Sequence, residues 1–97
     1  MIYHVVPAQQ WEAAQAKGLY EPDSLAIEGF IHASKESQVK GVLERYYPNQ
    51  TGLLLLHIDE DKLSSALKYE WAASVQDEFQ HIFGGLNLDA VIKTTII

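Results

Sequence analysis

The sequence predicts an α+β fold, and three observations support this class. Five short stretches, three of them rich in β-branched residues or leucine, predict strands. Two stretches in the N-terminal half have the composition or period of helices. The chain has 97 residues, of which 47% are hydrophobic and 21% charged, which is typical of one globular domain over residues 1–97 and not of a disordered chain. We therefore expect a largely antiparallel or mixed curved sheet, with both helices from the first half of the chain.

The first half of the chain contains both predicted helices. Pro7 ends the first strand, and Gly18 is the natural stop of an Ala-rich helix. Ser34 is expected to be the N-cap of a second helix, whose apolar residues recur at helical spacing. The expected elements are a strand at Ile2–Val6, a helix at Ala8–Lys17, a loop at Leu19–Glu28, a strand at Gly29–Ala33 and a helix from Ser34 to about Tyr47.

The second half of the chain is expected to be mostly strands. The run of four leucines that starts at Leu53 predicts a buried strand, because it is apolar on both faces. Asp59 can cap a short helical turn, and the segment around Gly84 and Gly85 shows no clear period. The expected elements are a strand at Leu53–Ile58, a turn to Leu63, a strand at Leu67–Ala72, an irregular segment at Val75–Leu88 and a strand at Ala90–Ile97.

Charge and composition exclude several classes of function. Seven Lys and Arg against 13 Asp and Glu give a net charge of −6, which argues against a nucleic-acid partner. The absence of cysteine excludes disulfides, thiol nucleophiles and Cys-ligated metal. No signal peptide and no apolar stretch long enough to cross a bilayer are visible, so we expect a cytoplasmic protein without a membrane partner.

Four histidines are the first candidates for a site. His4 and His32 fall within predicted strands, on faces that are otherwise apolar, so each imidazole needs a hydrogen bond or a ligand. If their strands are neighbours, the two rings share a pocket; a core histidine bonded to a carbonyl is the alternative for each. His57 is expected at a strand end near solvent. His81 lies between aromatic residues before the glycine pair, where a loop can hold a ligand and Gly84 lets it approach the backbone, or where the glycines only form a turn.

Other polar side chains have both a structural and a functional interpretation. Glu70 is either a solvated carboxylate beside Lys68 or a carboxylate at a pocket rim that stabilises a cation or accepts a proton. Ser34 is expected at a helix N-terminus, where its side chain can cap the helix and where an anion can also bind. Tyr20 can flank a flat ring or pack inward, whereas Trp11 is expected to be a core anchor.

The sequence resembles the small bacterial family known as domain of unknown function 952. The resemblance covers nearly the whole chain and is carried mainly by two blocks, EGFIHAS at residues 28–34 and FQHIFG at residues 79–84. Gln80 stands where the family typically has proline. The family's fold is understood to be similar to that of ADP-ribosyltransferases, a split pair of small sheets around a cleft that binds NAD.

The resemblance implies a cytoplasmic protein that binds NAD or a related ADP-ribosyl compound. It places His4 where a residue contacts the ribose, with His32 and His81 lining the cleft. An enzyme of this kind would displace a group at the ribose anomeric carbon, and Glu70 would stabilise the oxocarbenium-like transition state, with His81 as proton carrier. The candidate binding residues are His4, Tyr20, His32, Ser34 and Gly84.

Two alternatives remain open from the residues alone. Three scattered histidines could hold a metal ion for a hydrolase, although their spacing is not diagnostic. The chain could instead be a non-enzymatic binding module, in which the apolar, β-prone residues Thr94–Ile97 pair across the edge of a homodimer.

Overall fold

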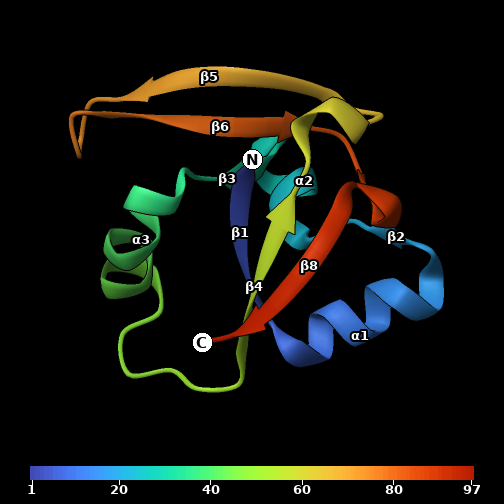
Figure 1. Ribbon diagram of the computed structural model, residues 1–97. Helices are drawn as coiled ribbons and strands as arrows, with labels where there is room; N and C mark the ends of the chain where they lie inside the picture. Colours follow the sequence, from blue (N-terminus) through green and yellow to red (C-terminus); the bar gives the residue numbers. More distant parts are fainter.

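Three small antiparallel sheets form the framework of the protein in a computed structural model that describes residues 1–97. The first sheet has the order β1-β4-β8, the second pairs β2 with β7, and the third has the order β3-β6-β5. Figure 1 shows β5 and β6 lying across one end of the first sheet, with α1 and α3 on opposite sides of it. The strands are β1 (Ile2–Pro7), β2 (Leu19–Tyr20), β3 (Ile31–Ala33), β4 (Leu53–Ile58), β5 (Ala66–Ala72), β6 (Asp77–Phe83), β7 (Leu86–Asn87) and β8 (Val91–Ile96).

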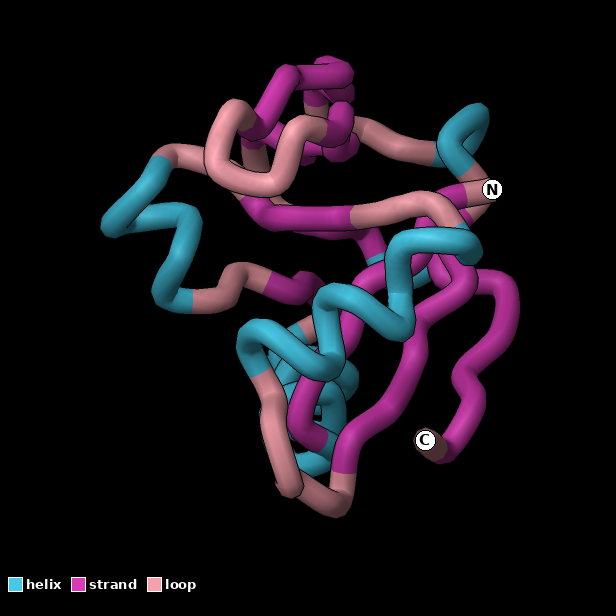
Figure 2. The backbone as a smooth tube through the Cα atoms, turned by 90° about the vertical axis from the view of Figure 1, so that its left-hand side faces the viewer, coloured by secondary structure: helices cyan, strands magenta, loops and turns pink.

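Three α-helices and three 3-10 turns connect these strands, and Figure 2 shows that the helices lie outside the strands. Helix α1 ends at Gly18, whose φ of 90° allows its N–H to donate to the Ala14 carbonyl. The elements are α1 (Ala8–Lys17), α2 (Asp23–Glu28) and α3 (Val39–Tyr46), and the turns η1 (Glu36–Gln38), η2 (Glu60–Lys62) and η3 (Leu88–Ala90). No helix is long and apolar enough to span a bilayer.

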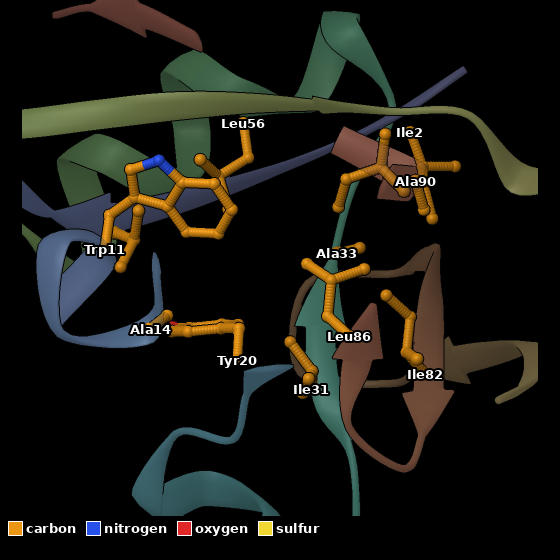
Figure 3. Close-up of a cluster of buried hydrophobic side chains, with 12 residues drawn as sticks. Ile2, Trp11, Ala14, Tyr20, Ile31, Ala33, Leu56, Ile82, Leu86 and Ala90 are labelled. Carbon is orange, nitrogen blue, oxygen red and sulfur yellow. The ribbon is translucent and has the colours of Figure 1, made fainter. Parts of the chain in front are cut away.

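One main core joins the three sheets. Leu56 and Ile58 of β4 are fully buried, and so are Ile31 of β3, Ile82 of β6 and Leu86. Figure 3 shows these side chains gathered with the ring of Trp11, so the expected core role of that tryptophan is confirmed. A smaller core forms under α3 from Val5, Val42, Leu53 and Phe79. Strands β1, β4 and β6 each contribute side chains to both cores, so these strands join the two cores.

The α+β class and the antiparallel pairing are confirmed, but the number of helices is not. The stretch Leu19–Glu28, expected to be a loop, contains β2 and the whole of α2. Helix α2 buries none of its own residues, so it has no apolar period from which it could be predicted. Pro22 precedes this helix and Gly29 follows it with a φ of 88°, which are its boundary signals.

The prediction of an irregular segment at Val75–Leu88 is wrong, because Asp77–Phe83 is a regular strand. Strand β6 is the central strand of its sheet, paired with β3 on one side and β5 on the other. It buries Phe79 towards one face and Gln80 and Ile82 towards the other. A strand covered on both faces does not alternate between apolar and polar residues, so it lacks the period that marks a half-exposed strand.

Ser34 is not a helix cap. It is buried, and its backbone exchanges two hydrogen bonds of 2.8 Å with Tyr3, which form a bridge between β3 and β1. The helical segment begins two residues later, with η1, and continues into α3. The side chain of Gln38 accepts from the Lys35 N–H at 2.8 Å, which supplies the cap. The turn capped by Asp59 is confirmed, since its carboxylate accepts from the Asp61 N–H.

Candidate functional site

His4 lies at the junction of the three sheets and makes two short hydrogen bonds. Its Nδ1 is 2.6 Å from the His32 carbonyl oxygen, and its Nε2 is 2.9 Å from the Tyr20 hydroxyl. A carbonyl only accepts, so Nδ1 carries the proton. In the neutral ring, Nε2 is then the acceptor and Tyr20 donates to it. Both ring nitrogens are therefore occupied by protein atoms.

Burial keeps His4 and Tyr20 uncharged. Burial lowers the pKa of His4, and the His32 carbonyl opposes this only in part. Burial also raises the pKa of Tyr20, as does the neighbouring Tyr47. When Tyr20 donates its proton to His4, its oxygen still has free lone pairs. His4 and Tyr20 together can therefore accept a hydrogen bond from a ligand and carry no net charge.

Two hollows adjoin at His4. The larger hollow, of about 460 Å³, lies between α1, β2 and the start of α2. The smaller hollow, of about 290 Å³, lies between β1, α2, β3 and α3. His4, Ser24 and Tyr47 line both of them, so these three residues form the junction. The larger hollow is also lined by Lys17, Tyr20 and Asp23, and the smaller one by Tyr3, Glu28, His32, Ser34 and Tyr46.

The smaller hollow brings together two of the predicted histidines. His4 and His32 both line it, which confirms that their strands are neighbours and that the two rings share a pocket. Burial, and to a smaller extent charge repulsion from His81, His4 and Arg45, together lower the pKa of His32 to about 4. His32 is therefore neutral at pH 7, and its buried Nε2 has no hydrogen-bond partner. A neutral imidazole offers hydrogen bonds but no charge to a ligand in this hollow.

His81 lies beside His32 but does not line either hollow. The two residues are directly opposite each other on β3 and β6, with ring centroids 5.4 Å apart. Nδ1 of His81 is 2.7 Å from a carboxylate oxygen of Glu70, and Phe30 stacks on the ring at 3.9 Å. The carboxylate can only accept, so it fixes the proton on Nδ1 and leaves Nε2 as the free base of the neutral ring. Glu70 is therefore partly exposed and also hydrogen-bonded to the imidazole of His81.

The remaining predicted residues are divided between the site and its surroundings. Tyr20 lines the larger hollow and Ser34 the smaller one. Gly84 lies outside both, and its φ of 153° serves the turn between β6 and β7, so the structural interpretation of the glycine pair holds there. His57 is half-buried in β4 and bonds Thr95 of β8 at 2.7 Å, in keeping with a structural role.

A three-histidine metal site is not formed. No group of three His, Asp or Glu side chains lies close enough to hold a metal ion. The physical reason is that His4 uses both ring nitrogens within the protein, whereas His81 is bound to Glu70 on another sheet. The hydrolase alternative therefore has no ligand set.

Sequence reasoning missed several residues of the site, including all of those from α2. Ser24 and Glu28 belong to α2, which was expected to be a loop, and Tyr47 is the last residue of the predicted second helix. The boundary pair Pro22 and Gly29 was the signal that could have revealed α2. Nothing local to Tyr47 indicates that it separates two hollows.

The fold and the two hollows define a small α+β protein with a concave site at the meeting point of three sheets. The chain belongs to the family of proteins of unknown function DUF952, whose model matches residues 5–94. No curated protein matches the sequence.

Solved structures of one related protein share this fold. The chain is similar to the crystal structure of protein CC0527 from Caulobacter crescentus, with 27% identity and a TM-score of 0.88 over 98% of this chain and 83% of that chain. A double mutant of CC0527 gives 26% identity and the same TM-score and coverage. Its solution NMR structure gives 27% identity and a TM-score of 0.83 over 99% of this chain and 83% of that chain.

Proposed function

We propose that the protein binds NAD or a related ADP-ribosyl compound across the two adjoining hollows. The observation that carries this proposal is the shared junction at His4, Ser24 and Tyr47, which makes one bipartite site from two hollows of different lining. Such a ligand consists of two ring-and-sugar halves joined by a pyrophosphate. The family resemblance also leads us to expect a fold similar to that of ADP-ribosyltransferases, and we include this similarity in the proposal.

The lining suits sugars and rings better than buried phosphate. His4, His32 and Tyr20 are uncharged at neutral pH, so they exchange hydrogen bonds with hydroxyl or amide groups. Tyr46 and Tyr47 provide aromatic surface beside them. The cation that lines the site is Lys17, which is paired with Glu21 at 2.8 Å and largely exposed at the rim of the larger hollow. The pyrophosphate is therefore expected to stay near solvent.

The role of His4 is changed by its two internal hydrogen bonds. It cannot donate to a ribose hydroxyl without losing the His32 carbonyl, and its other nitrogen is occupied by Tyr20. We therefore propose that Tyr20, held by His4, presents its oxygen as an acceptor to a ligand hydroxyl in the larger hollow. His4 is then a positioning residue.

Calorimetry with NAD, ADP-ribose and nicotinamide tests the proposal. Binding of NAD or ADP-ribose, with a matching rise in Tm, is the expected result, because a ligand that binds only the folded state stabilises it. Ser24→Phe should fill the junction and abolish binding. Ile27→Phe is the matched control on the same helix, since Ile27 is 80% exposed and lines neither hollow. Folded protein that binds none of the three compounds at millimolar concentration would refute the proposal.

The Glu70–His81 pair supports a second, catalytic candidate. Nε2 of His81 is a free base fixed in orientation by Glu70 and Phe30, as general-base catalysis requires. His81 lies outside both hollows but beside His32 of the smaller one, so this candidate requires the nicotinamide end of NAD to extend past His32. Water would then attack the anomeric carbon, the glycosidic C–N electron pair would leave with nicotinamide, and His81 would accept the water proton. Nicotinamide release by the wild type, reduced at least about tenfold in His81→Gln with NAD binding retained, is the expected result. Binding without release of nicotinamide would leave a binding protein and exclude this candidate.

A further inference from the structure

Strand β8 presents a free, apolar edge to solvent. It is an outer strand of its sheet and pairs only with β4; in Figure 2 it forms the outer side of the molecule. Ile92 is 49% exposed and Ile96 85% exposed. Edge strands in natural proteins are normally protected by prolines, bulges facing the open side or several charges. β8 has one charged residue, Lys93, and no proline, and its one bulge lies near its start, at Ile92, where the pairing with β4 shifts register.

From Lys93 onward the edge is regular and is held in place by β4. Thr94, Thr95 and Ile96 pair in register with β4, and the pairing continues through the Ile97 N–H, which donates to the Leu53 carbonyl at 3.1 Å. His57 bonds the Thr95 hydroxyl and fixes the strand from one face. The outward-facing backbone groups of β8 are therefore ordered and available for another strand.

The residues of β8 are self-complementary in one register. We propose that two copies of this chain pair antiparallel through β8, with the two-fold axis at Thr94. Ile92 then lies opposite Ile96 of the second copy, twice in the dimer, and Lys93 lies opposite Thr95. An axis at Lys93 would place two ammonium groups opposite each other, and an axis at Thr95 would leave Ile92 without an apolar partner.

A groove beside the edge accepts the extra side chain. It measures about 300 Å³ and lies between α1 and β8, and its lining includes Trp11, Leu88, Ile92, Lys93 and Thr94. Thr94 and Ile96 share one face of β8, and Ile92 lines the groove together with Thr94 despite the bulge. Ile96 of the second copy, opposite Ile92, therefore lies at the mouth of this groove. The six-stranded sheet of the dimer would leave both hollows of the bipartite site open. The dimer proposal therefore does not depend on the proposed function.

Disulfide trapping tests the register directly, because the chain has no cysteine. Residues opposite each other on antiparallel strands have Cα atoms about 4.5–5.5 Å apart, within the range that a disulfide bridges. Thr94→Cys is expected to form a covalent dimer under mild oxidation. Lys93→Cys tests the alternative axis, and Ile27→Cys reports random collisions at an equally exposed site away from β8.

Sedimentation of the wild type and of one charged variant completes the test. The wild type should sediment as a dimer at high concentration, and Ile96→Lys should weaken association at least about tenfold by placing a charge in the apolar pair. Ile27→Lys, which changes an isoleucine of similar exposure, should not affect it. A monomer at all concentrations, or equal crosslinking of the three cysteine variants, would overturn the proposal.

Discussion

Gln80 is fully buried in β6, and neither polar atom of its amide has a hydrogen-bond partner. It pairs with Ala33 on β3 and Tyr69 on β5 and points to the face that carries Ile82. Removing an amide from water without a new partner costs about 1–3 kcal/mol. Gln80 therefore lowers the stability of the fold from within β6, the central strand of its sheet.

Replacing Gln80 by methionine is expected to stabilise the protein. Methionine has a similar length and no amide to desolvate, so Gln80→Met should raise the free energy of unfolding by about 1–2 kcal/mol in urea titrations. Gln38→Met is the matched control and should lower it by about 1–3 kcal/mol. The reason is that the buried Gln38 amide accepts from Lys35 and donates to the Glu78 carbonyl. Destabilisation by Gln80→Met would mean that the amide is hydrogen-bonded after all.

At the scale of the element, two glycines show how the same residue type serves opposite purposes. Gly84 ends β6 with a φ of 153°, and a Cβ there would collide with the hydroxyl of Ser65, which itself donates to the Gly85 carbonyl at 2.8 Å. Gly41 lies within α3, where a Cβ would meet only the end of the flexible Arg45 side chain. The turn needs its glycine, whereas the helix does not.

The two alanine variants should change stability in opposite directions. Gly84→Ala is expected to lower the free energy of unfolding by about 1–3 kcal/mol, through backbone strain and the clash with Ser65. Gly41→Ala should raise it by about 0.5–1 kcal/mol, because alanine restricts the unfolded chain and favours the helix. Chemical denaturation of both variants at one pH measures the two changes. An unchanged Gly84→Ala would show that the turn can relax.

At the scale of the whole molecule, His4 connects all three sheets through two hydrogen bonds. It belongs to β1, bonds the His32 carbonyl of β3 and accepts from Tyr20 of β2. The bonds bring the two hollows together at one side chain, so the same imidazole that shapes the site also stabilises the fold. A loss of binding in a His4 variant is therefore interpretable only beside its stability.

A double-mutant cycle separates the contribution of this connection. His4→Phe should lower the free energy of unfolding by about 2–3 kcal/mol and Tyr20→Phe by about 1 kcal/mol. The double variant should lose less than the sum, by about 1 kcal/mol, since both single changes remove the same hydrogen bond. Tyr47→Phe is the control, because its hydroxyl is 3.5 Å from the Val5 carbonyl and contributes little. Strict additivity would contradict a hydrogen bond between His4 and Tyr20.

The sequence by itself determined the α+β class, the first helix, the strand of four leucines and the burial of Trp11. These features depend on local composition and period, which a chain displays before it folds. It also indicated that His4 needs polar partners, because burying an imidazole without them is costly; the same expectation for His32 is not met at its Nε2, which has no partner. The family resemblance was confirmed over most of the chain.

Only the tertiary structure decided where those partners are. β6 has no strand period because two neighbours and two covered faces hold it, and α2 forms the site without burying a residue of its own. His81 lies beside His32 instead of in the hollow because pairing of β3 with β6 sets that position. Three features depend on residues far apart in the chain: the strand register, the carbonyl that fixes His4 and the junction at Tyr47. Long-range contacts of this kind leave no local pattern in the sequence.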